Sequence, residues 1–172
     1  FAADEHNQES LPRVELDIRD SDRDPSMAAR QVAELCGDDK IVSILGPVFS
    51  NEVFASAGIA QARGVPLITP TATANGIAAI GAFIFQANPD FEMRGRAMAR
   101  YALQQLKDST LAVLSPIEPP GKLIADAFID EVKAQGGVIV DVQWYQAGAT
   151  DLHVQLETMR RRALEMAALP YV

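Results

Sequence analysis

The sequence predicts an α/β protein with doubly wound parallel sheets, because short apolar runs alternate with longer amphipathic stretches along the chain. One run and the stretch after it take up roughly 25 residues, about the length of a strand and its crossover helix. Of the 172 residues, 48% are hydrophobic and 22% charged, as in soluble globular proteins. We therefore expect right-handed βαβ units.

The first βα unit lies at residues 14–36. Residues 14–19 alternate apolar and polar side chains, which predicts a half-buried strand. Asp24 and Pro25 then supply an N-cap and a first-turn proline for a helix that continues to about Cys36. Gly37 is expected to stop that helix. Residues 1–7 read as the last turns of an earlier helix.

The next elements follow the same pattern. Residues 41–45 form a nearly continuous apolar run, as expected for a buried parallel strand. Ser50 or Asn51 is expected to cap a helix that ends at Gly64, where glycine accommodates a left-handed backbone. Residues 65–69 predict the following strand, with Pro66 at its start, where a missing N–H is tolerated.

A short helix over residues 74–79, a strand over 82–86 and a turn at 88–90 complete the first half. The pattern then restarts. The apolar spacing predicts helices over residues 92–107, 122–135 and from 150 or 151 to 164, and strands over 110–114 and 138–144. The turn at 88–90 is the expected crossover between two parts of the chain.

Charge and composition exclude several classes of partner. The net charge of −8 disfavours binding to nucleic acid or to an anionic membrane surface. The longest apolar runs fall short of the roughly 20 residues that a spanning helix needs. The opening residues lack the features of a signal peptide. The single cysteine, Cys36, allows no internal disulfide and is interpreted as a buried structural thiol.

No catalytic or metal-binding set stands out in the sequence. The series Asp20, Asp22 and Asp24 begins like a calcium loop, but Pro25 follows where glycine is needed, so we interpret it as a solvated acidic turn. His6 and His153 have no partner at ligand spacing. The chain is therefore predicted not to be an enzyme, and no cofactor or metal is expected.

Two loops remain as a candidate binding site. Residues 46–51 and 69–73 follow neighbouring strands, and ligands of open parallel sheets bind at the carboxyl ends of the strands. Their hydroxyls and backbone N–H groups, next to a helix N-terminus, suit an anionic group such as a carboxylate. The residues alone leave an equal alternative, in which Ser50 is only a cap and Thr71 and Thr73 are only turn residues.

Several motifs resemble those of type I periplasmic solute-binding proteins, and among these the receptors of branched-chain amino acid ABC transporters. They are Asp20-x-x-x-Asp24-Pro25, Ile44-Leu45-Gly46-Pro47-x-x-Ser50, the block over residues 64–73, Phe85-x-x-x-Pro89, Gly95-x-Ala97-x-Ala99, Ala125-Asp126-Ala127-Phe128 and Gly136-Gly137. The resemblance runs in order along nearly the whole chain.

This resemblance implies two α/β lobes that close on a ligand about a hinge. Residues 1–90 would be the first lobe, without its first strand and most of its first helix, and residues 91–172 the start of an incomplete second lobe. By position, Ser50, Asn51, Thr71, Ala72 and Thr73 would bind the ligand, which is expected to be an amino acid or a related small carboxylate or amide.

The resemblance also implies a periplasmic or extracellular protein that delivers its ligand to the membrane permease of an ABC transporter. Neither nucleic acid nor direct membrane insertion is expected. In one loop this chain departs from the pattern, because Pro119 and Pro120 precede Gly121 where amino-acid receptors often carry an aromatic residue. A sensor or protein-interaction domain of the same fold, without transport, is therefore the alternative.

Overall fold

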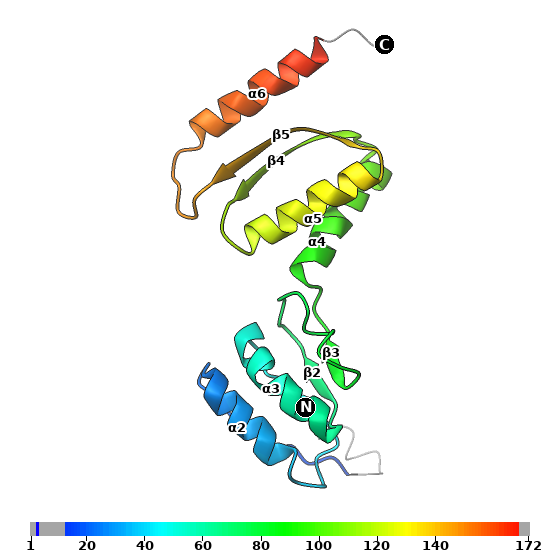
Figure 1. Ribbon diagram of the computed structural model, residues 1–172, viewed down its shortest axis with the longest axis vertical. Coiled ribbons are helices and arrows are strands. Elements are labelled where there is room, and N and C mark those ends of the chain that lie inside the picture. Colours follow the sequence, from blue (N-terminus) through cyan, green and yellow to red (C-terminus); the bar gives the residue numbers. More distant parts are fainter. Residues whose placement is uncertain (1–2, 4–12, 169–172) are drawn as a thin grey trace.

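The computed structural model describes residue 3 and residues 13–168, and within them parallel strands alternate with helices (Figure 1). The strands are β1 (Ile44–Leu45), β2 (Leu67–Thr69), β3 (Ile84–Gln86), β4 (Thr110–Pro116) and β5 (Val138–Tyr145). The helices are α2 (Pro25–Leu35), α3 (Ser50–Arg63), α4 (Phe91–Arg100), α5 (Gly121–Ala134) and α6 (His153–Ala167). This confirms the predicted α/β class with parallel sheets.

The strands form two separate sheets. One has the order β1-β2-β3, and the other pairs β4 with β5; every pairing is parallel. We call residues 13–86 the first unit and residues 91–168 the second unit. They are joined by residues 87–90, which include the turn predicted at residues 88–90.

In the first unit, α2 and α3 pack on each other, and α3 contacts β2 and β3. Leu67 of β2 is 0% exposed, and Val32 of α2 and Val53 of α3 belong to the same buried cluster. Asp24 caps α2 with Pro25 at its first position, and Gly64 ends α3 with φ of 68°, as the sequence predicts.

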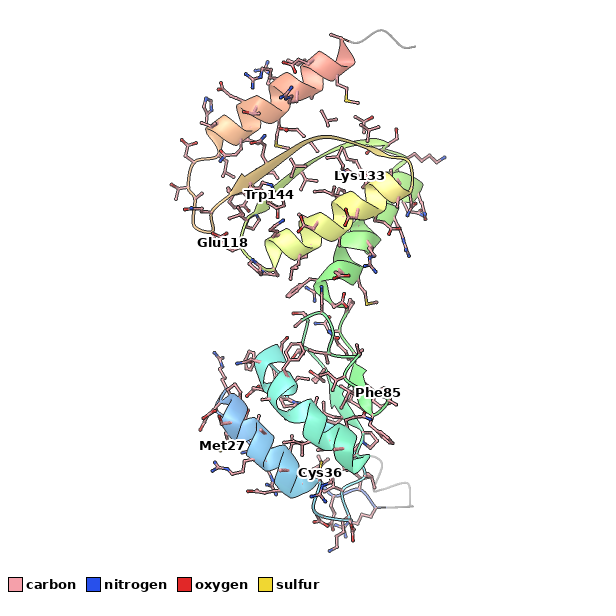
Figure 2. The ribbon with its side chains drawn as sticks, in the orientation of Figure 1. Met27, Cys36, Phe85, Glu118, Lys133 and Trp144 are labelled. Carbon is pink, nitrogen blue, oxygen red and sulfur yellow. The ribbon has the colours of Figure 1, made fainter. Side chains whose placement is uncertain are left out.

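The face of the first sheet that points away from α3 carries an apolar row. Leu45, Ile68 and Phe85 are direct neighbours across β1, β2 and β3. Leu45 is 76% and Phe85 50% exposed, and Figure 2 shows Phe85 on the side of the sheet away from α2 and α3. Within the described residues, this sheet is thus covered by helices on one face, and the doubly wound prediction is met here only in part.

Residues 14–19 form no strand, contrary to the prediction. All six are exposed, and within the described residues they pair with no strand. A groove of about 480 Å³ lies between this segment and residues 40–47, with α2 as its floor. Two directly hydrogen-bonded strands leave no such space between them. The alternation of residues 14–19 therefore occurs without the strand pairing that it predicts.

Residues 74–79 form turns instead of the predicted helix. Gly76 has φ of 87°, and the N–H groups of Ala79 and Ile80 each bond a carbonyl three residues back. A stretch this short cannot offset the cost of starting a helix, so the packing of the buried Ile77 decides its shape.

In the second unit, α4 and α5 lie on one side of the sheet and α6 on the other (Figure 1). The α4–α5 approach is close at Gly95, where a Cβ atom would stand 2.9 Å from Cβ of Ala127 and would overlap the backbone oxygen of Ile124. The predicted helix over 92–107 divides into α4 and a π-helical turn, Tyr101–Leu106, which ends at Lys107 with φ of 60°.

Candidate functional site

The candidate site lies where the loops after β1 and β2 meet. Both loops leave the carboxyl ends of neighbouring parallel strands, and the first leads directly into α3. In Figure 1 the arrows of β4 and β5 end on the side of the second unit where Figure 2 labels Glu118 and Trp144.

Side chains of each loop bind the backbone of the other. The Ser50 hydroxyl accepts hydrogen bonds from the N–H groups of Thr73 and Ala74, each at 3.2 Å. In return, the Thr71 hydroxyl donates to the carbonyl of Val48 at 2.8 Å. Thr69 makes a similar bond, donating to the carbonyl of Pro47 at 2.8 Å. The structure therefore brings Ser50, Thr71 and Thr73 into one cluster.

The prediction that Ser50 or Asn51 caps α3 is wrong. The N-cap is Phe49, which has an extended backbone and no side-chain oxygen to bind the first turn. Glu52, 1% exposed, accepts from the N–H of Phe49 at 3.2 Å and from the hydroxyl of Ser21. Because Glu52 completes this end of the helix, the Ser50 oxygen is free to bind the neighbouring loop instead.

The hydroxyls in this cluster keep some hydrogen-bonding capacity. A hydroxyl can donate once and accept twice. Ser50 accepts two N–H groups, and within the described residues no acceptor faces its proton. Thr71 donates its proton, so its oxygen can still accept. Added to the first-turn N–H groups of α3, these atoms offer both donors and acceptors to a small polar molecule.

The other two predicted residues, Ala72 and Asn51, make no side-chain hydrogen bond between the two loops among the described residues. Ala72 is 2% exposed and its side chain has no polar atom, so only its backbone has hydrogen-bonding groups, and its carbonyl already accepts from the Gln86 amide at 3.0 Å. Asn51 is exposed in the first turn of α3.

Two residues that shape the loop were not predicted. Gln86 also binds the carbonyl of Ala74 at 3.3 Å, and Asn88 binds that of Thr71 at 3.1 Å. Gln86 is the last residue of β3 and Asn88 follows it closely, so their position beside the loop depends on strand pairing. Only their place after a third parallel strand could have suggested them.

In the second unit, Glu118, Lys122 and Trp144 lie at or near the carboxyl ends of β4 and β5. The Glu118 carboxylate accepts from the N–H of Ala147 at 2.9 Å. Lys122, in the first turn of α5, lies 4.8 Å from the centre of the Trp144 ring and pairs with Asp126. Figure 2 shows Glu118 and Trp144 at the same end of the second unit.

Titration and metal chemistry add little to this cluster. Burial raises the pKa of the Cys36 thiol, which is half-buried and lies outside the two loops, so it stays protonated. Among the residues that the structure describes, no group of three or more His, Cys, Asp and Glu side chains could hold a metal ion. His6 lies outside the described residues. The described helices include none long and apolar enough to cross a membrane.

Comparison with known proteins gives consistent matches. Residues 2–165 match the family described as periplasmic binding protein. The chain is 27% identical over 149 residues to the leucine-, isoleucine-, valine-, threonine- and alanine-binding protein of Pseudomonas aeruginosa. The aligned region covers 86% of this chain and 40% of that protein.

Two solved structures share the fold. One is the branched-chain amino acid transporter substrate-binding protein of Streptococcus pneumoniae in complex with isoleucine, with a TM-score of 0.64, 27% identity and 92% and 46% of the two chains covered. The other is an ABC transporter substrate-binding protein of Desulfitobacterium hafniense in complex with Leu, with a TM-score of 0.78, 20% identity and 94% and 49% covered. The chain thus spans about half the length of these proteins.

Proposed function

The chain belongs to the periplasmic binding protein family, and from this we propose that it is part of an extracytoplasmic receptor for an amino acid or a related small carboxylate or amide. The receptor would deliver its ligand to the permease of an ABC transporter from the periplasm or the cell exterior. Membership in a family of binding proteins agrees with the prediction that the chain is not an enzyme.

In this proposal the boundary between the two lobes lies near residue 90. Two separate sheets and the connection through residues 87–90 support this division. Each lobe would be a doubly wound sheet. The exposed row of Leu45, Ile68 and Phe85 supports a further layer on the first sheet, because parallel sheets are normally covered on both faces.

The observation that carries the proposal is the contact between Ser50 and the backbone of Thr73 and Ala74, which joins two donor-rich loops at the carboxyl ends of adjacent strands. A ligand carboxylate would accept from the Ser50 hydroxyl and from first-turn N–H groups of α3, at Ser50 and Asn51. The ligand's ammonium group would donate to the oxygens of Thr71 and Thr73, and Ala72 would contribute through its backbone.

The charge around this cluster suits a ligand with both signs. Glu52 places an acidic side chain in the first turn of α3, where it binds the N–H of Phe49. An amino acid carries a positive group beside its carboxylate, so it meets less repulsion there than a simple anion. The names of the relatives, which bind leucine, isoleucine or valine, support the same ligand class.

Calorimetric titration of the full-length protein with leucine, isoleucine, amides and small carboxylates tests this proposal. Ser50→Ala and Thr73→Val should each weaken binding by about 1–3 kcal/mol for each charge-assisted bond lost. Ser26→Ala removes an exposed hydroxyl far along the chain from both loops and serves as the control. A folded protein that binds nothing in the panel would contradict the proposal.

A sensor or protein-interaction domain of the same fold is the second candidate, favoured by Pro119 and Pro120 before α5. These prolines offer no aromatic ring for stacking and no polar atom in their side chains. In that case, Thr73→Val should leave the affinity for a protein partner unchanged, whereas a receptor should lose ligand binding. Pull-down with each variant separates the two functions.

A further inference from the structure

Amide and carboxyl side chains link the first unit to α4 across the crossover. The Asn75 amide donates to Oε1 of Glu92 at 2.8 Å, and Oδ1 of Asn75 accepts from the backbone N–H of Glu92 at 3.4 Å. The other carboxylate oxygen of Glu92 binds Arg96 at 2.7 Å, which orients the carboxylate. Asn75 and Glu92 are both half-buried.

This two-point contact is isolated. Between residues 15–86 and 91–168, the described part of the chain contains no other direct hydrogen bond or ion pair across the crossover. Two bonds that share the same pair of residues restrict rotation as well as separation. Asn75 and Glu92 therefore restrain the direction of α4 relative to residues 15–86.

The same contact is continuous with the candidate ligand loop. Asn75 directly follows Ala74, whose N–H binds Ser50 and whose carbonyl binds Gln86. On the other side of the loop, Asn88 binds the carbonyl of Thr71 and accepts from Arg94 of α4 at 3.3 Å. The loop is thus held to α4 at both of its ends.

We propose that Asn75 and Glu92 are positioning residues that fix the angle between the two units and couple it to the ligand loop. A molecule bound at residues 71–73 would shift the loop, and the Asn75–Glu92 pair would pass that shift to α4. Neither residue needs to touch the ligand. The part of this inference that concerns ligand rests on the proposed function, whereas the part that concerns the angle does not.

Distances between spin labels on the two units test the angle without any ligand. The labels are placed on the full-length protein at the exposed positions Arg30 of α2 and Lys133 of α5, using Arg30→Cys and Lys133→Cys. Cys36→Ser removes the one cysteine of the 172-residue sequence. Asn75→Ala should broaden the distance distribution, because both hydrogen bonds to Glu92 are lost.

Exchanging the amide and the carboxylate between positions 75 and 92 should restore the contact. Asn75→Asp alone sets two carboxylates against each other and should broaden or shift the distances further. Combined with Glu92→Gln, it restores an amide–carboxylate pair with the donor on the other residue, and the distribution should narrow again. Gln104→Ala is the matched control. It removes a side-chain hydrogen bond to Gln135 inside the second unit and should leave the distance distribution unchanged.

Unchanged distances in both Asn75→Ala and Asn75→Asp, with circular dichroism showing folded proteins, would overturn the inference. Failure of the double variant to restore the distribution would also overturn it. With a ligand from the titration panel, Asn75→Ala should weaken affinity by about 5-fold or more, as expected for coupled sites. If the distances respond as expected but nothing in the panel binds, the positioning role stands and the proposed ligand class is rejected.

Discussion

The two units share one architecture but are stabilised in different ways. The strands of the first unit have two or three residues, and side-chain hydrogen bonds join the loops at the carboxyl ends of β1 and β2. The strands of the second unit have seven and eight residues, with helices on both sides. Rigid loops on short strands suit a preformed binding surface, whereas the second unit depends on its ladder and helix packing.

The largest effect is expected from Leu67→Ala, in the core of the first unit. The loss of a fully buried leucine should lower the free energy of unfolding by about 2–5 kcal/mol. Urea titration followed by circular dichroism should show an early transition. Trp144 lies in the second unit, so its fluorescence midpoint should stay in place.

Leu156→Ala on α6 is the control for that experiment, because this leucine is exposed and its loss should cost little. If Leu67→Ala shifts the Trp144 midpoint as far as the circular dichroism midpoint, the units unfold together and the distinction between them fails.

Gly95→Ala tests the second unit. The added methyl group would overlap the backbone of α5, so α4 and α5 must move apart, at a cost of about 1–3 kcal/mol. Here the Trp144 midpoint should fall. Gly58→Ala is the opposite control: this helical glycine of α3 has nothing within 4 Å, and alanine there should stabilise the first unit by up to about 1 kcal/mol.

Ser50→Ala measures how much the loop bonds stabilise the first unit when no ligand is present. Two N–H groups lose their acceptor, which should cost about 1–3 kcal/mol if water cannot replace it. The circular dichroism transition should move to lower urea, with Ser26→Ala unchanged. No shift would mean that water substitutes for the hydroxyl and that the loops are less fixed than we infer.

The smallest effect concerns pH and Glu131 in the second unit. A hydrogen bond from Arg100 lowers the pKa of Glu131 below its ordinary value, and a hydrogen bond from Gln135 adds a smaller effect in the same direction. The folded form therefore holds its proton less tightly than the unfolded form, so the stabilisation is present above the ordinary glutamate pKa and is lost as pH falls through the lowered value. Arg100→Gln should flatten the pH dependence of the Trp144 midpoint in this acidic range.

Local signals predicted most of the helices and strands. Asp24 with Pro25 and the left-handed Gly64 marked helix ends correctly, because these caps involve only neighbouring residues, whereas the predicted Ser50 cap failed because that hydroxyl binds a distant loop. The alternation of residues 14–19 predicts a strand, but a strand also needs a ladder, and the two sheets of the described residues do not include this segment. The family resemblance is confirmed by the match over residues 2–165.

The candidate site was less predictable than the fold. The meeting of the loops followed from strand order, yet the contacts inside the cluster join residues more than 20 positions apart, such as Ser50 and Thr73. The sequence could not show that Glu52 would complete the start of α3 and release Ser50, or that Gln86 would hold the loop. The ligand role of the five residues remains a prediction.

The apolar row on the first sheet has a practical consequence for handling the 172-residue chain by itself. Leu45, Ile68 and Phe85 form an apolar patch on a sheet face that no helix of the described residues covers, and such a surface promotes self-association. The apparent molecular mass of this chain from light scattering should therefore rise with protein concentration. A charged residue in place of Phe85 should keep the sample clear at concentrations where the natural sequence turns turbid.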